Sequence, residues 1–239
     1  PGISSAASDV YKRQIVDTFG YKRINSVSIM KLSKDGQKVI GSKENISCDS
    51  LGISGGWTPA VHLFTQSGGK LKFRDDDQVF IPNTYPSNQI SIGSCNGDFT
   101  LDEILINTPK LLKEFLNIKK TEYENIEIYS AFNKSKRNIW LLPSNKIVGK
   151  TKSFVDFQND ATAKDIKLAL REGFRSIEHV KRYTTTGMGT DQGKLGNMHA
   201  LGIISETASS KMGELGTTTF RPPYTPLTFG TIVGRNVGK

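Results

Sequence analysis

The stretch from Phe154 to Asn197 constrains the fold most, because glycines and capping residues divide it into short helices. Thr162 precedes an apolar pattern and is followed three residues later by Asp165, a spacing typical of a capping box in which Asp replaces the usual Glu. Apolar residues recur on one helical face up to Gly173, a residue type that commonly ends helices. The pattern predicts a first helix that begins after Thr162 and ends near Gly173.

Two further helices and a glycine-rich segment follow. Ser176 is predicted to cap the second helix through its hydroxyl. Residues 184–194, which we call the glycine loop, come next, and Thr190 or Asp191 is predicted to cap a third helix that runs to about Thr207. The stretch therefore predicts a small all-α domain with a tight loop between its second and third helices.

Composition narrows the class of protein. The chain has 239 residues, of which 36% are hydrophobic and 23% charged, as in ordinary globular proteins. It contains no apolar run long enough to span a membrane. Cys48 and Cys95 lie far apart without a CxxC motif and are predicted to be reduced, packed thiols of a cytoplasmic protein.

The net charge of +9 raises the question of nucleic-acid binding. The lysines are scattered, however, and no basic stripe interleaved with aromatic residues is present. A basic surface that faces solvent, an acidic protein partner or an anionic cofactor is therefore the preferred interpretation, and no nucleic-acid partner is expected.

The segments FVDFQND (154–160) and REGFRSIEHVKRYTTTGMGTDQGK (171–194) resemble the alpha subunit of heterotetrameric sarcosine oxidase, and the resemblance runs from about Ile24 to Arg235. Related opine oxidases carry this small domain as a ferredoxin-like 2Fe-2S module with four cysteine ligands. The matching positions in this sequence are Asp156, Gln158, Asp191 and Gly196. Iron–sulfur clusters need thiolates, so we expect no cluster and no other metal here.

The resemblance implies an α/β fold: a partial two-dinucleotide-binding lobe, of the pyridine nucleotide-disulfide reductase type, followed by a small all-α BFD-like domain. The predicted division is a non-native or disordered leader at 1–14, the partial lobe at 15–106, a connector at 107–150, the helical domain at 151–215 and an extended linker at 216–239. The chain is thus expected to be a fragment whose linker leads to a folate-binding domain outside this sequence.

Two junctions are predicted to contribute to a partial NAD site. The first joins strand material from Ile24–Leu51 to a glycine–proline turn, and the second joins a strand at Gln89–Ile92 to a helix capped by Thr100. The candidate cofactor-binding residues there are Gly55, Gly56, Trp57, Pro59, Gly93, Asn96 and Gly97. Because no GxGxxG motif is present, these turns cannot complete a nucleotide site, and the first can equally be a plain tight turn.

The glycine loop is the strongest local candidate for a ligand contact. Its glycines and the positive start of the next helix suit a phosphate or ring carbonyl, and the resemblance implies FMN between alpha and beta subunits. The candidate residues are Arg182, Gly187, Gly189, Thr190, Gln192 and Lys194. The alternative is that the glycines serve only as packing turns between helices.

No catalytic constellation is visible in the sequence. His62 lies in an apolar run and is interpreted as a packed, hydrogen-bonded residue, and Asp75–Asp77 as a solvated turn. Met188 and Met198 are expected to fill the core, and neither His179 nor His199 has a second ligand-type residue at the spacing of a metal site. Trp140 is expected to pin the connector.

The resemblance implies the oxidative demethylation of sarcosine by O2, with transfer of the one-carbon unit to tetrahydrofolate. It also implies that the beta subunit holds FAD and that the chain assembles with beta, gamma and delta subunits, so that the fragment alone would be inactive. Two alternatives stay open: a subunit of another amine or opine oxidase, and a non-catalytic assembly module.

Overall fold

The computed structural model describes residues 13–34, 38–53, 56–86, 88–118, 138–142 and 152–235. The chain forms two compact units, one of Pro1–Gly55 with Ile139–Ser153 and the other of Gly56–Asn138 with Phe154–Lys239. The predicted lobe at 15–106 is therefore divided at Gly55. Its second part belongs to the same unit as the helices of the predicted domain at 151–215.

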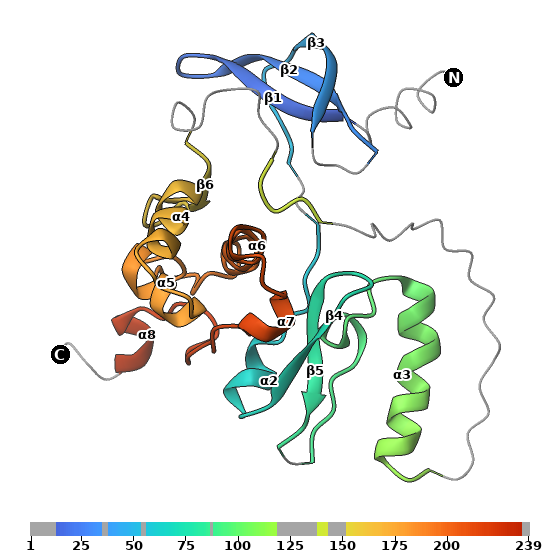
Figure 1. Ribbon diagram of the computed structural model, residues 1–239. Coiled ribbons are helices and arrows are strands. Elements are labelled where there is room, and N and C mark those ends of the chain that lie inside the picture. Colours follow the sequence, from blue (N-terminus) through green and yellow to red (C-terminus); the bar gives the residue numbers. More distant parts are fainter. Residues whose placement is uncertain are drawn as a thin grey trace. The chain divides into compact units, whose positions relative to one another are not determined.

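The first unit contains an antiparallel sheet of β1 (Arg13–Gly20), β2 (Ile24–Leu32) and β3 (Val39–Ser47), with β2 in the middle (Figure 1). Val27 and Met30 are buried on β2. The strand prediction for Ile24–Leu51 is confirmed up to Ser47, where β3 ends.

The predicted leader at 1–14 extends too far. Arg13 pairs with Lys31 and Gln14 with Met30 in the β1–β2 ladder, so β1 begins inside the predicted leader. Arg13 also forms an ion pair with Glu44. Residues 1–12 lie outside the described part of the chain.

The second unit begins with α2 (His62–Gln66) and an antiparallel hairpin of β4 (Lys70–Arg74) and β5 (Val79–Thr84). Val79, Phe80 and Ile81 of β5 are buried. The short 3-10 helix η1 (Gly93–Asn96) and helix α3 (Leu101–Phe115) follow. As predicted, Thr100 caps α3, in a capping box with Glu103.

Two predictions for this region are wrong. No strand forms at Gln89–Ile92, and these residues lead directly into η1. In the described residues, the sheet of β4 and β5 has two strands and offers Gln89–Ile92 no pairing partner. The predicted connector at 107–150 begins inside α3, because the helical pattern continues through Phe115. Trp140 lies in the described piece 138–142 and is half-buried, and residues 119–137 and 143–151 lie outside the described part.

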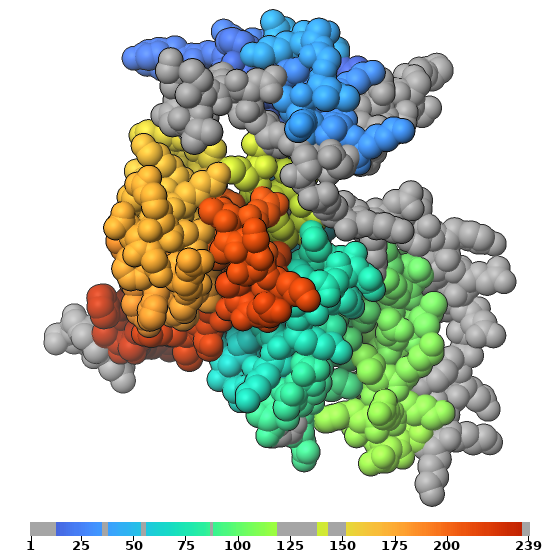
Figure 2. Space-filling model, in the orientation of Figure 1, coloured from blue at the N-terminus to red at the C-terminus, as the bar shows by residue number. Residues whose placement is uncertain are grey.

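The remaining elements of the second unit are mostly helical. They are β6 (Phe154–Asp156), β7 (Ala161–Thr162), α4 (Ala163–Arg171), α5 (Ile177–Thr184), α6 (Asn197–Ala208), α7 (Met212–Leu215) and α8 (Phe229–Val233). Helix α4 packs against α5 and α6 (orange and red in Figure 2). Ile166, Val180, Leu201 and Ile204 form the buried centre of these three helices.

The first two helices agree with the sequence, and the third does not. Thr162 and Asp165 form the predicted capping box of α4, and Ser176 precedes α5, although it makes no side-chain cap. Helix α6 begins at Asn197 instead of at Thr190 or Asp191. The intervening residues form successive turns, in which Gln192 N donates to Gly189 O and the Asp191 carboxylate accepts from Gly193 N.

Candidate functional site

Asp156, the last residue of β6, anchors the start of the glycine loop. Its carboxylate accepts hydrogen bonds from Gly187 N at 2.7 Å, Gln158 N at 2.8 Å and Asn159 N at 3.0 Å, with Asn159 Nδ2 at 3.3 Å. Burial alone would raise the pKa of Asp156, but these bonds outweigh it and hold the pKa below its usual value. Asp156 is therefore a charged, fully bonded group that fixes the loop.

Gln158 anchors the middle of the loop in a similar way. Its Oε1 accepts from Thr190 N at 2.6 Å and from Thr190 Oγ1 at 3.1 Å. A Cβ at Gly189 would collide with this same Oε1, so the close approach requires glycine. Gly187 and Gly193 have φ values of +72° and +74°, and a Cβ at either would collide with Asn197 Oδ1. The glycines therefore serve close packing within the chain, which is the alternative interpretation of the loop.

The end of the loop binds residues 217–224, a segment that we call the strap. Gln192 Oε1 accepts from Arg221 N at 2.8 Å, and Gln192 Nε2 donates to Arg221 O at 2.8 Å and to Pro223 O at 3.0 Å. An amide side chain can pair in this way with a backbone N–H and C=O, as a neighbouring strand would. Gln192 thus fixes the middle of the strap.

Lys194 and Asn197 bind the strap on either side of this pairing. Lys194 Nζ donates to Tyr224 O and lies 4.2 Å from the centroid of the Tyr224 ring. Asn197 Nδ2 donates to Thr218 Oγ1 at 3.0 Å and to Gln192 O at 3.1 Å. Two of the residues predicted to contact a cofactor, Gln192 and Lys194, therefore bind the protein's own backbone.

Under the strap lies a cavity of about 50 Å³. Its lining is contributed by the turn before α2, the β4–β5 hairpin, helices α5 and α6, the glycine loop and the strap. The lining residues are Thr58, Pro59, Val61, His62, Leu71, Phe80, Ile177, Gly193, Lys194, Asn197, Met198, Leu201, Thr217, Thr218 and Phe220. Most of these side chains are apolar, and the volume is sufficient for a few water molecules.

His62 is a buried polar residue that lines this cavity. It is 8% exposed, and its Nδ1 has no hydrogen-bond partner among the described residues. Its ring lies 3.9 Å from that of Phe220 and 5.3 Å from that of Tyr224, between centroids. Burial, and secondly the charge of Lys194, lower the pKa of His62 below its usual value, so the imidazole is neutral at pH 7. The prediction that His62 is packed is confirmed, but the hydrogen bond predicted with it is not found at Nδ1 within the described residues.

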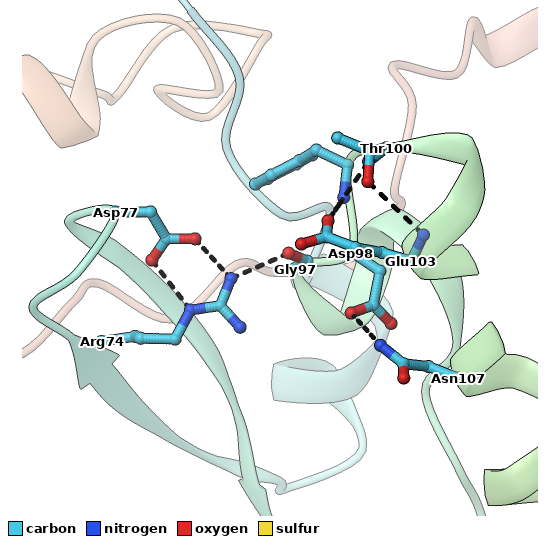
Figure 3. A network of polar contacts seen from close by, with 8 residues as sticks. Arg74, Asp77, Gly97, Asp98, Thr100, Glu103 and Asn107 are labelled. Carbon is cyan, nitrogen blue, oxygen red and sulfur yellow. Dashed lines mark hydrogen bonds and ion pairs between the residues drawn. The ribbon is translucent and has the colours of Figure 1, made fainter. Parts of the chain in front are cut away.

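The η1–α3 turn is held by a second polar network (Figure 3). Arg74 Nε donates to Asp77 Oδ1 at 2.8 Å, and its NH2 group donates to the second Asp77 oxygen and, at 2.8 Å, to Gly97 O. Asp98 Oδ1 accepts from Asn107 Nδ2 at 3.0 Å. Asp77 therefore belongs to an ion pair with a side chain only 10% exposed, which corrects the prediction for this residue. Asp75 and Asp76 lie in an exposed turn, as predicted.

The backbone N–H groups at the start of α3 already have a carboxylate partner. Glu103 Oε2 accepts from Phe99 N at 3.2 Å and from Thr100 N at 3.3 Å. A second anion at this helix start would compete for these donors and would meet the negative charge of Glu103. The turn containing Gly93, Asn96 and Gly97 therefore does not fit a nucleotide phosphate.

The other predicted residues are placed as follows. Gly55 lies outside the described residues. Trp57 is 75% exposed, and Gly56 has open space around its Cα, so neither forms a pocket wall. Arg182 forms an ion pair with Glu178 at 3.4 Å on the exposed side of α5. Met188 is 56% exposed, which corrects its prediction as a core residue; it lies in a surface loop, not in a helix.

The glycine loop does not fit a phosphate through its predicted donors either. Gly187 N and Thr190 N are bound by Asp156 and Gln158, and Lys194 is bound to the strap. Asp191 adds a further negative charge, and its carboxylate accepts from Gly193 N at 3.1 Å. In both predicted places the sequence identified a turn correctly, but side chains of the same chain occupy its donors.

Sequence patterns do not identify several residues of this site. In the sequence, Asp156 and Gln158 stand out only as positions without a thiol, and no pattern marks Asn197. The strap was identified only as an extended, proline-rich segment. The partners of these residues lie about thirty positions away in sequence, as the spacings of 31 for Asp156 and Gly187 and 29 for Gln192 and Arg221 show. No local periodicity can reveal such pairings.

Two other kinds of site are absent from the described residues. Among residues 13–34, 38–53, 56–86, 88–118, 138–142 and 152–235, no group of three or more His, Cys, Asp or Glu side chains could hold a metal ion. In the same residues, no helix combines the length and apolar character needed to cross a lipid bilayer. Cys48 and Cys95 are both free thiols and half-buried.

Comparison with known proteins identifies relatives of this chain. Residues 150–235 match the family described as "Sarcosine oxidase A3 domain". The chain is 36% identical over 203 residues to the sarcosine oxidase alpha subunit of Rhizobium meliloti (strain 1021), which covers 83% of this chain and 20% of the relative. It is 32% identical over 235 residues to the corresponding protein of Corynebacterium sp. (strain P-1), covering 94% of this chain and 24% of the relative. The chain thus spans about a fifth to a quarter of these relatives.

Two other matches are shorter or more distant. An opine oxidase subunit of Rhizobium meliloti (strain 1021) is 33% identical over 73 residues, which is 30% of this chain and 16% of the relative. The crystal structure of L-proline dehydrogenase from P. horikoshii superposes with a TM-score of 0.55 at 19% identity, covering 93% of this chain and 44% of the other, and shows a shared mixed α/β fold. By sequence, residues 150–235 belong to the sarcosine oxidase A3 domain family, and most of the chain is homologous to part of the sarcosine oxidase alpha subunit.

Proposed function

We propose that this chain is part of the alpha subunit of an oxidoreductase complex that oxidises sarcosine. The observation that carries the proposal is the similarity to sarcosine oxidase alpha subunits over 83–94% of the chain. The shorter match to an opine oxidase subunit covers 30% of it, which makes an opine the second candidate substrate. Hydrogen bonds between segments far apart in sequence, such as those of Asp156 with Gly187 and of Gln192 with Arg221, support a structural role for this chain in the complex.

Within that complex, the second unit serves as a scaffold that joins separate parts of the chain. The strap contacts side chains of α2, the glycine loop and α6. Asp156 and Gln158 separately hold the backbone of the glycine loop at Gly187 and Thr190. In this proposal, three functions belong to the complete complex with its beta, gamma and delta subunits. They are flavin chemistry with FMN and FAD, the binding of NAD, and transfer of the one-carbon unit to tetrahydrofolate. Side chains of the same chain occupy backbone donors at both predicted turns, which leaves Arg182 as the remaining candidate contact to a cofactor phosphate.

The proposal is tested by expressing the complete alpha subunit that contains this chain together with its partner subunits in the cytoplasm of a bacterial host. Hydrogen peroxide formation is then measured with sarcosine, an opine and L-proline at equal concentrations. We expect sarcosine to be the preferred substrate and the purified complex to contain flavin. A preference for the opine would support the second candidate, and a stable complex that has no flavin and oxidises none of the three would contradict both.

Arg182 provides the remaining test of a flavin contact in this domain. Its side chain is 61% exposed, and its ion pair with Glu178 links neighbouring turns of one helix, which contributes little to stability. If Arg182 holds a flavin phosphate, Arg182→Ala will lower the flavin content of the complex, while Arg175→Ala, also at an exposed position, will not. Equal flavin content in both variants would remove Arg182 from the candidate site.

A further inference from the structure

The strap covers the most completely buried histidine of the chain. The imidazole of His62 touches two aromatic rings of the strap, Phe220 at 3.9 Å and Tyr224 at 5.3 Å. The chain has three histidines, and the other two, His179 and His199, are exposed. His62 therefore differs from both in burial and in its contact with a separate segment.

The surroundings of His62 favour its neutral form. The lining of the cavity beside it is apolar, apart from Thr58, Lys194, Asn197, Thr217 and Thr218. The ionisable groups that face the imidazole are Lys194, from the glycine loop, and Tyr224, from the strap; the residues that face it from β4, β5, α5 and α6 are apolar or amide side chains. No carboxylate of the described residues lines the cavity, so a proton on His62 would be buried beside a lysine without a counter-charge.

Few other contacts hold the strap closed against the cost of burying a protonated His62. Most of its residues are exposed, with Thr218 buried and Phe220 half-buried. Its polar contacts come from three side chains, Gln192, Lys194 and Asn197, and the net contribution of each hydrogen bond of this kind to stability is small. A buried, uncompensated charge costs more than one such bond contributes.

We propose that the strap is a latch that closes when His62 is neutral and opens when His62 takes up a proton. Opening separates Phe220 and Tyr224 from the imidazole, which then reaches water through the uncovered cavity. Because the pKa of His62 is lowered in the closed form, that form is favoured above the pKa of a free imidazole, about 6.5. As the pH falls below this value, the equilibrium shifts toward the open form. The proposal rests on contacts within the second unit and not on the proposed oxidase function.

Hydrogen–deuterium exchange of the 239-residue chain tests the latch. After correction for the intrinsic exchange rate at each pH, we expect exchange of a peptide spanning 217–224 to rise from about pH 7.5 to about pH 5.5, by at most about tenfold, because a free imidazole becomes protonated over this range. A peptide from α4 serves as the internal reference and should stay protected. A strap that exchanges equally at both pH values, or only together with α4, would overturn the proposal.

Two variants separate His62 from other titrating groups. His62→Phe keeps an aromatic ring in contact with the strap but cannot be protonated, so exchange of the strap should no longer depend on pH. His179→Gln, at an exposed position, should keep the full pH dependence. If the His62 variant does not fold, an NMR titration of the unmodified chain decides: the resonances of the His62 imidazole and of the strap must change with the same midpoint, and separate midpoints would contradict the latch.

Discussion

Asp156 shows how one buried carboxylate fixes a loop that lies far away in sequence. It accepts three backbone N–H bonds and one amide bond, including that from Gly187 in the glycine loop. Carboxylates bonded in this way contribute stability only while they are ionised. The depressed pKa means that this contribution is present above pH 3.8, the usual value, and is lost as the pH falls through the folded-state value.

Asp156→Asn should therefore destabilise the chain at neutral pH by on the order of 2 kcal/mol, because an amide offers one acceptor oxygen and turns an N–H group toward the donors. Urea unfolding at about pH 7 and about pH 3 measures the effect, which should shrink at the lower pH because the stabilisation by ionised Asp156 decreases once the pH falls below 3.8. Asp160→Asn is the matched control at an exposed position with φ +53°, which asparagine tolerates. Equal stability of the two variants would show that Asp156 does not anchor the loop.

Gly193 provides the second prediction at this scale. Its φ is +74°, and a Cβ would collide with Asn197 Oδ1. Gly193→Ala should lower stability by about 1–3 kcal/mol, from backbone strain and displacement of the asparagine. Gly173→Ala shares the positive φ, at +98°, but meets no atom within 4 Å. If urea unfolding shows a larger loss of stability for Gly193→Ala than for Gly173→Ala, the difference measures the collision with Asn197. Equal losses would mean that only the backbone conformation matters and would contradict a role for this contact.

At the scale of elements, the capping box of α4 is predicted by a local sequence pattern and is present in the structure. Thr162 Oγ1 accepts from Asp165 N at 3.4 Å, and Asp165 Oδ2 accepts from Thr162 N at 2.8 Å. Thr162→Ala should cost about 1 kcal/mol, the usual value for loss of an N-cap side chain. Thr219→Ala, at an exposed strap position, is the control. A midpoint of thermal unfolding that is the same for both variants would contradict the assignment.

The Arg74 network connects two elements that the sequence treats separately. Arg74 joins the β4–β5 turn to the carbonyl of Gly97 at the end of η1, and the side chain is 29% exposed (Figure 3). Arg74→Met should destabilise the chain by about 1.5–3 kcal/mol, the range for hydrogen bonds to charged groups, because Asp77 and Gly97 O lose their donor. Lys72→Met, at an exposed position on the same strand, should change stability little. Similar losses in urea unfolding would show that the network contributes nothing.

Sequence patterns predicted elements whose signals are local. The cap at Thr100, the capping box at Thr162 and the strands β2 and β3 all follow from spacing within a few residues. The start of α6 could not be predicted, because the glycine loop satisfies its backbone groups through Asp156 and Gln158, more than thirty residues earlier. A glycine-rich loop with these residue types is typical of an anion-binding site. Only the structure shows that Asp156 and Gln158 already accept hydrogen bonds from its backbone N–H groups.

At the scale of the whole molecule, the chain joins segments that are widely separated in sequence. In the second unit, the strap touches α2 through His62 and the glycine loop through Gln192 and Lys194. These contacts bring together the segment after Gly56 and the sarcosine oxidase A3 domain at 150–235. Gln192 and Lys194, two of the residues predicted to bind a cofactor, thus hold these segments together.

Hydrogen–deuterium exchange of the strap in the Gln192→Ala variant tests this claim most directly. Gln192 makes three hydrogen bonds to the strap backbone, each of about 1 kcal/mol net, and tenfold faster exchange corresponds to about 1.4 kcal/mol. We expect the strap at 217–224 to exchange at least about tenfold faster at about pH 7.5, with α4 unchanged. Strap exchange identical to that of the unmodified chain would contradict the account.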